Sequence, residues 1–385
     1  MMLPLTHIKE LNRTLDINTS QHTAAGAFVP YLQAVGRGQR SGRSLTQAEA
    51  FDAMTMLLEN RITREQRGAF LMLLRVREET AEEIAGFTQA CRTTLPNALT
   101  QHADQADSKT VIDLDIGAYA GKRRQLPWFL LAVACLVEQG VKVGMHGTQE
   151  PESQRLYIQS VLSQLSASIR AKNTLLKTQE SEWQATSIVN IEAKIKQRGF
   201  VYADLSLLHP QLDELIQLRE VFGLRSCANT LARLLNPFNA SYSFQGVHHK
   251  HVDDKHAEVA RLLDEQNILC FRGEGGEPEV DPSKETILKV CRHGNIEHIN
   301  LIPEQRWELK PKALDVNTLA LVWQGAKMHS YGENTVISSL AALLILLENK
   351  TQDQAFSEAK KLWKARNGTR FLGVDAHFSS SFDVI

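Results

Sequence analysis

The first stretch that could do chemistry is DIGAYAGKRRQL, which spans residues 115–126. A strand-like run breaks at Gly117 into a glycine-bracketed loop, and three consecutive cations follow: Lys122, Arg123 and Arg124. Glycines let backbone amides turn toward phosphate oxygens, and cations attract those oxygens. Because the loop ends a strand, where ligand crevices form in α/β sheets, the pattern predicts a phosphate-binding site. The alternative is a solvated turn that keeps the loop soluble.

A second basic stretch, VGRGQRSGRSLT, carries Arg37, Arg40 and Arg43 with glycines and serines between them. Alternating cations and glycines favour contact with successive phosphates rather than with one buried anion. The alternative is a flexible surface loop. We predict that the two clusters act in binding if they line one groove.

The overall composition limits how the chain could bind a polyanion. The net charge is −1 and the pI is near 6.9, which excludes binding through overall charge and leaves only local clusters. Five cysteines lie far apart without a CxxC pair, which predicts reduced, buried thiols of a cytoplasmic protein. The runs LPWFLLAVACLV and LAALLILL are too short to span a bilayer, so we expect buried helices and no membrane partner.

The apolar pattern predicts an α/β fold with a small N-terminal helical domain and a larger α/β domain that has a mostly parallel central sheet. Apolar residues recur at three and four from Leu45 to Arg92, with Thr46 and Thr63 as helix N-caps. Short strand-like runs then alternate with helices. We place the helical domain at 1–105, completed by helices within 205–236, and the α/β domain at 106–385. The expected strands are VIDLDI, VKVGMH, GFVYAD and NILCFR, followed by a hairpin around HGN and helices at 336–349 and 352–366.

Three stretches resemble the anthranilate phosphoribosyltransferase family (glycosyltransferase family 3), whose helical domain is shared with the pyrimidine nucleoside phosphorylases. GAFLMLLRVREETAEEIAGF resembles a helix pair of that family. VKVGMHGT stands in the place of its "VAKHGN". LHPQLDELIQLREVFGLRSCANTLARLLNP resembles "HPAM…VRxELGxRTxFNxLGPLxNP", with matches at His209, Pro210, Arg219, Gly223, Arg225, Asn229, Leu231, Asn236 and Pro237.

Departures from the family concern the phosphate and metal sites. In the biosynthetic enzymes a GTGGDG loop holds the pyrophosphate of phosphoribosyl pyrophosphate through backbone amides. Here Tyr119 fills that turn, and cations stand where the amides were. The family's magnesium-binding acids match RGEGGEPEV, in which Glu277 stands for the first acid, Pro278 replaces the second and Glu279 is displaced by one place. One acid predicts weak magnesium binding at most, and no cofactor is certain.

The resemblance also implies a substrate crevice. The counterpart of Arg225 faces the carboxylate of anthranilate, although a structural arginine between domains is an equal alternative. His146 is a site residue by its match to the family, or a satisfied core histidine because it follows an apolar strand. The predicted crevice residues are Gly117, Tyr119, His146, Gly147, Thr148, Arg225 and Asn229.

The basic loop RGQRSGR resembles the "GRGKNxARDL" loop of divergent members that bind DNA and RNA without sequence preference. We therefore expect a homodimer, formed through the helical domain, that binds nucleic-acid phosphates and lacks anthranilate activity. A second hypothesis is a phosphoribosyl or glycosyl transferase acting on another acceptor, for which phosphoribosyl pyrophosphate would be the partner. A third is a structural remnant without a ligand.

Overall fold

The structure is a computed structural model that describes residues 26–38, 40–96, 111–150, 153–172, 182–304, 310 and 312–376. The chain divides into two compact units. The helical unit comprises Met1–Thr94 and Leu218–Leu231, and the α/β unit comprises Leu95–Gln217 and Ala232–Ile385. The boundary predicted at Gln105 lies outside the described residues.

The helical unit consists of short helices with strong local start signals. It contains a helix at residues 26–36, then α2 (Gln47–Leu58), α3 (Arg64–Arg77), α4 (Ala81–Thr93) and α11 (Arg219–Phe222). Thr46, Thr63 and Thr80 each accept a hydrogen bond from the backbone amide three residues later, and the side chain at that later position bonds back. Helices α2, α3 and α4 therefore each begin with a capping box, which satisfies two amides that would otherwise lack partners.

Aromatic rings and one buried ion pair hold the helical unit together. The ring of Phe70 lies 5.1 Å from that of Phe28 and 6.1 Å from that of Phe87, in edge-to-face geometry. The buried carboxylate of Glu83 pairs with Arg77 and accepts the backbone N–H of Leu45 at 2.7 Å. These contacts join three helices and the segment that precedes α2.

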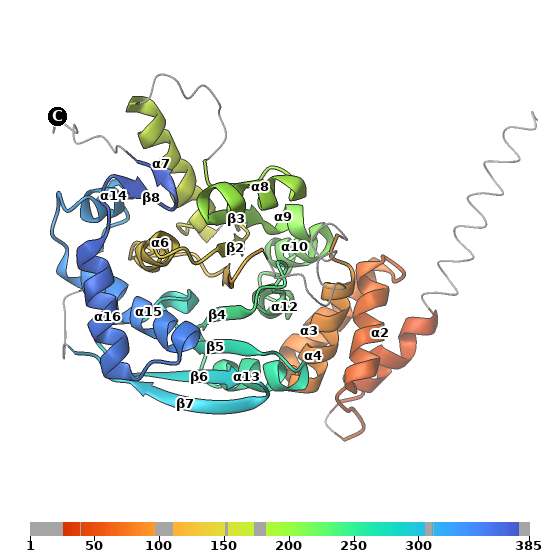
Figure 1. The fold of residues 1–385 in the computed structure, drawn as a ribbon. Coiled ribbons are helices and arrows are strands. Elements are labelled where there is room, and N and C mark those ends of the chain that lie inside the picture. The colour runs from red at the N-terminus through yellow and green to blue at the C-terminus, as the bar shows by residue number, and fades with distance from the viewer. Residues whose placement is uncertain are drawn as a thin grey trace, which may run out of the picture. The chain divides into compact units, whose positions relative to one another are not determined.

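The α/β unit is built on one sheet. Among the described residues its strand order is β3-β2-β1-β4-β5-β6-β7 (Figure 1). The five strands from β3 to β5 are parallel, and β6 and β7 form the antiparallel hairpin predicted around HGN. The strands are β1 (Leu114–Ala118), β2 (Val143–Gly147), β3 (Phe200–Asp204), β4 (Tyr242–Val247), β5 (Asn267–Arg272), β6 (Thr286–Arg292) and β7 (Asn295–Leu301), with a separate hairpin of β8 (Arg370–Phe371) and β9 (Val374–Asp375).

Helices cover both faces of this sheet, because alternate residues of each strand point to opposite faces. Phe200 and Tyr202 of β3 belong to one apolar core, whereas Val201 and Ala203 belong to another. The helices are α6 (Phe129–Glu138), α7 (Ile158–Lys172), α8 (Ile188–Arg198), α9 (Leu205–Leu208), α10 (Pro210–Gln217), α12 (Ala228–Leu234), α13 (Val252–Leu262), α14 (Asn317–Trp323), α15 (Ser330–Glu348) and α16 (Gln352–Ala365). The predicted fold class and the predicted strands are confirmed.

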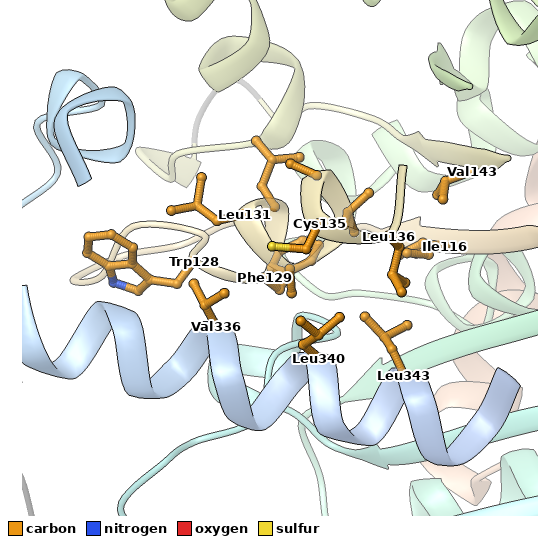
Figure 2. Packing of buried hydrophobic residues seen from close by; sticks show 14 of the residues in the cluster. Ile116, Trp128, Phe129, Leu131, Cys135, Leu136, Val143, Val336, Leu340 and Leu343 are labelled. Carbon is orange, nitrogen blue, oxygen red and sulfur yellow. The ribbon is translucent and has the colours of Figure 1, made fainter. Parts of the chain in front are cut away.

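The largest core lies between α6 and α15. Figure 2 shows Phe129 and Cys135 of α6 above Val336 and Leu340 of α15. By length and composition α15 is the one helix among the described residues that could cross a membrane, but 72% of its apolar window is buried inside the protein. It is a core helix of this unit, packed against α6.

Gly86 provides a test of the helical unit, since a Cβ at this position would overlap the carbonyl oxygen of Gln47 and crowd Ala50. We expect Gly86→Ala to lower the free energy of unfolding by about 1–3 kcal/mol. Gly68→Ala is the control, because its Cβ would meet only the Phe222 ring at 3.7 Å and alanine favours the helix by about 1 kcal/mol. Urea denaturation measures both, and equal midpoints would contradict the close approach of α4 to α2.

Candidate functional site

The loop of residues 119–128 lies at the carboxyl edge of the sheet. It connects β1 to α6, and β1 has β2 on one side and β4 on the other, in parallel register. Gly117 is level with His146 of β2 and Gln245 of β4. The carboxyl ends of these strands therefore meet at one edge, the usual place for a ligand in an open α/β sheet.

Lys122 points into the protein rather than toward solvent. Its side chain is 3% exposed, and its Nζ donates to Glu279 Oε1 at 2.6 Å and to the carbonyl oxygen of Glu274 at 3.3 Å. The second oxygen of Glu279 accepts the backbone N–H of Phe129, the first residue of α6, at 2.9 Å. A helix N-terminus beside a lysine is an attractive place for an anion. Here the chain's own carboxylate occupies that place.

Glu277 is also committed to the loop. Its carboxylate is buried and accepts the backbone N–H of Gly121. Burial raises the pKa of Glu277, and the nearby Arg233 guanidinium is the first group that opposes this rise. A Cβ at Gly246 or Gly273 would overlap the carbonyl of Glu277, so both positions must be glycine for the segment after β5 to fold this closely.

The acids of this segment do not fit a magnesium ion. Both oxygens of Glu279 are held, by Lys122 and by Phe129, and Pro278 supplies no side-chain oxygen. Glu277 Oε1 accepts from Gly121, which leaves a single buried Glu277 oxygen without a hydrogen bond among the described residues. Across the described ranges, no group of three or more His, Cys, Asp or Glu residues is arranged to hold a metal ion. Magnesium needs several oxygens at near-octahedral positions, which these carboxylates do not offer.

Tyr119, His146 and Asp115 form a buried chain of hydrogen bonds. The Tyr119 hydroxyl lies 2.6 Å from His146 Nδ1, and His146 Nε2 lies 3.4 Å from Asp115 Oδ2. Burial raises the pKa of Tyr119 well above its ordinary value, so the phenol keeps its proton. His146 Nε2 faces the carboxyl group of Asp115. Arg233 lies over the Tyr119 ring at 5.9 Å, so the turn after β1 is filled by side chains.

The other crevice residues of the α/β unit are packed against protein groups. A Cβ at Gly147 would overlap the carbonyl oxygen of Ala118, and a Cβ at Gly117 would lie 3.3 Å from His146 Cε1. The hydroxyl of Thr148 donates to Asp213 Oδ1 at 2.7 Å. The structure therefore brings Gly117, Tyr119, His146, Gly147 and Thr148 together at one sheet edge, where they contact one another or neighbouring elements.

Arg123 and Arg124 are exposed, unlike Lys122. The three consecutive cations therefore do not form one surface cluster, because Lys122 is buried against Glu279. Two further exposed cations lie at the same sheet edge: Lys250 follows β4, and Arg272 ends β5. A binding role for Arg123 and Arg124 stays a prediction.

The remaining predicted residues belong to the helical unit. Arg37 donates to Gln33 Oε1 at 3.1 Å, Arg43 pairs with Glu49 at 2.6 Å, and Arg40 is exposed in a turn. Arg225 is partly buried and Asn229 is buried. A groove that these residues share with the loop after β1 stays a prediction, as does a homodimer through this unit.

Two residues that sequence reasoning did not select contribute most to the site. Arg233 stands where the family pattern LGPLxNP has its first proline, so this departure could have identified it. Glu279 was visible only as a displaced acid. Its partner Lys122 is 157 residues away in the sequence, and no local pattern pairs the two.

His256 of α13 offers a pH test of the buried polar groups at this edge. Its Nδ1 lies 2.8 Å from Gln245 Oε1, and burial lowers the pKa of His256 to about 3. The unfolded chain binds a proton near pH 6.5 and the folded chain does not, so stability falls as pH drops below 6.5. Between pH 6.5 and 4.5 we expect His256→Gln to flatten this loss by up to about 1.4 kcal/mol per pH unit. His249→Gln, at an exposed position, is the control. Identical slopes in urea titrations of His256→Gln and the parent would contradict the burial of a neutral imidazole.

Comparison with known proteins identifies relatives of the whole chain. Anthranilate phosphoribosyltransferase from Dictyoglomus thermophilum is 26% identical over 343 residues, covering 86% of this chain and 93% of the relative. The enzyme of that name from Methylocella silvestris is 28% identical over 314 residues, covering 79% of this chain and 83% of the relative.

Solved structures share the fold. Anthranilate phosphoribosyltransferase from Thermus thermophilus matches with a TM-score of 0.65 and 20% identity, over 86% of this chain and 93% of that one. The enzyme from Saccharomyces cerevisiae, solved in complex with PRPP and Mg, matches with a TM-score of 0.66 and 17% identity, over 90% and 96%. At these identities the likeness concerns the fold.

Two family models match two separate parts of the chain. The model described as glycosyl transferase family, helical bundle domain, matches residues 29–94, and the one described as glycosyl transferase family, a/b domain, matches residues 185–369. The loop after β1 and strand β2 lie between these ranges. Since the two models together match more than half of the chain and agree with its helical and α/β units, the chain belongs to the anthranilate phosphoribosyltransferase-like group of glycosyl transferase family 3.

Proposed function

We propose that this protein does not make phosphoribosyl anthranilate and instead binds the backbone phosphates of nucleic acid without sequence preference. The observation that carries the first half is the ion pair of Lys122 with Glu279. It fills the place at the end of β1 where the family's glycine-rich loop would hold a pyrophosphate.

The backbone donors of the loop are also in use. Phosphate cradles depend on amides that point at an empty position. In this chain the amide of Gly121 donates to Glu277, and the amide of Phe129 donates to Glu279. A pyrophosphate would have to displace two buried carboxylates to reach these donors. Transfer of a phosphoribosyl group requires the enzyme to hold the leaving pyrophosphate in the transition state. A loop whose donors are already occupied does not provide this stabilisation.

The second half of the proposal rests on the exposed cations. Arg123, Arg124, Lys250 and Arg272 follow or end three neighbouring parallel strands, so they share one edge of the sheet. Their exposure distinguishes them from Lys122, which neutralises a buried acid. Exposed cations at such an edge suit contact with a chain of phosphates, which supplies affinity without reading the bases.

For the enzymatic half, we expect no enzyme-dependent loss of anthranilate fluorescence in the presence of magnesium and excess phosphoribosyl pyrophosphate. Loss of one positioned donor can lower a rate by about a hundredfold or more, and here the whole loop is filled. The Dictyoglomus thermophilum relative serves as the positive control in the same assay. Robust turnover by this protein would overturn the enzymatic half.

For the binding half, we compare Arg123→Ala/Arg124→Ala with the parent protein in titrations of single-stranded and duplex oligonucleotides. The double variant should bind more weakly, and its plot of log K against log salt should become shallower by roughly 0.7–0.9 for each phosphate that is no longer neutralised. The melting temperature should change little, because exposed charges add little stability. Lys122 is kept, since its removal would leave Glu279 buried without its partner.

The matched control is Lys142→Ala/Lys361→Ala, which removes the same charge from exposed positions elsewhere on the α/β unit. An unchanged affinity and slope in the Arg123/Arg124 variant would refute this assignment of the surface. Absence of binding by the parent protein at low salt would refute the binding half altogether.

A further inference from the structure

The contacts of Glu279 are those of a bound anion rather than of an ordinary surface acid. The side chain is fully buried, one oxygen meets the Lys122 ammonium at 2.6 Å, and the other meets the Phe129 amide at 2.9 Å. A positive side chain and the first amide of a ten-residue helix are the donors that small oxyanions use in proteins. The segment after β5 places a carboxylate between them.

We propose that Lys122 and the N-terminus of α6 form a binding site for one small oxyanion, and that Glu279 is its internal ligand. In the natural chain the site is filled by this carboxylate. With the carboxylate removed, the site takes a free carboxylate such as acetate, or inorganic phosphate. This inference deepens the first half of the proposed function, since it says why a phosphate-bearing substrate finds no place at this loop.

The donors are held in place independently of Glu279, which makes the site preformed. The backbone of Lys122 exchanges two hydrogen bonds with Leu156, at 2.9 and 2.8 Å. Its ammonium has a second acceptor in the carbonyl oxygen of Glu274, at 3.3 Å. The amide of Phe129 belongs to a helix that is buried along its length. Loss of the Glu279 side chain therefore leaves the donors where they are and opens a space of about the size of the carboxylate removed.

In Glu279→Ala, binding of an anion from solution at the position of the lost carboxylate is expected to be favourable. Removing one member of a buried ion pair leaves an uncompensated buried charge, which is strongly destabilising. An anion from solution restores the pairing and stabilises only the folded chain, so the melting temperature should rise with its concentration and then saturate. In the natural protein the Glu279 carboxylate already provides this pairing.

The experiment measures melting temperatures of the parent, Glu279→Ala and Lys122→Met/Glu279→Met in chloride, acetate, formate and phosphate at one ionic strength and pH 7. Glu279→Ala should melt below the parent in chloride and regain roughly 2–4 °C or more as acetate, formate or phosphate is added. The parent should respond equally to all anions. The double variant, which has neither charge, should lack the saturable rise. Recovery with acetate and formate but not phosphate would assign the site to planar carboxylates.

A folded Glu279→Ala that responds to acetate, formate and phosphate no more than to chloride would overturn the inference. So would a saturable rise of equal size in the double variant. If Glu279→Ala is obtained only in unfolded form, its refolding yield from urea is compared in chloride and in acetate. A higher yield in acetate supports the site, and equal yields would refute it. The anthranilate and oligonucleotide assays leave Lys122 and Glu279 unchanged, so failure of the proposed function is seen separately from failure of this inference.

Discussion

Lys122 and Glu279 bring opposite charges into a region that excludes water, where each charge would be costly without the other. Burial raises the pKa of Glu279, and the Lys122 charge is the first influence that opposes it. The pair joins the loop after β1 to the segment after β5 and supplies the N-terminal acceptor of α6. The pair therefore links the loop after β1, the segment after β5 and the first turn of α6 at one edge of the sheet.

Around this pair the chain keeps the fold of its family, and polar side chains at the sheet edge contact one another. Apolar patterns that form the sheet and its covering helices tolerate many substitutions, because burial depends on size and period rather than on identity. The crevice is less tolerant, since each buried polar group needs a partner. Tyr119, His146 and Asp115 are joined by hydrogen bonds, and Arg233 lies beside both Tyr119 and Glu277. The side chains that fill the crevice thus form a connected set rather than isolated substitutions.

The sequence predicted the parts that depend on local pattern. Strands β1, β2, β3 and β5, the hairpin at HGN and the sheet edge occupied by the loop after β1 follow from period and from turn residues. Strand β4, which lies between β1 and β5, was not among the predicted strands. The sequence did not predict that Lys122 points inward while Arg123 and Arg124 point outward. The inward orientation of Lys122 depends on its contact with Glu279. Glu279 lies in the segment after β5, so the contact exists only when β4 and β5 have joined β1 in the sheet. Arg233 has a signal in the sequence, because it replaces a proline of the family pattern, but its contact with the Tyr119 ring is visible only in the fold.

The threonine caps of the helical unit and the buried ion pair of the α/β unit differ in how far apart in the sequence their contacting residues lie. Each cap joins residues three apart, so α2, α3 and α4 can begin to form from local sequence. Lys122 and Glu279 are 157 residues apart, and their contact must wait for a long loop to be closed. During synthesis on the ribosome, Lys122 emerges well before Glu279. For that interval Lys122 and the amides of the loop after β1 have no access to Glu277 and Glu279, so water must solvate them until the segment after β5 has been made.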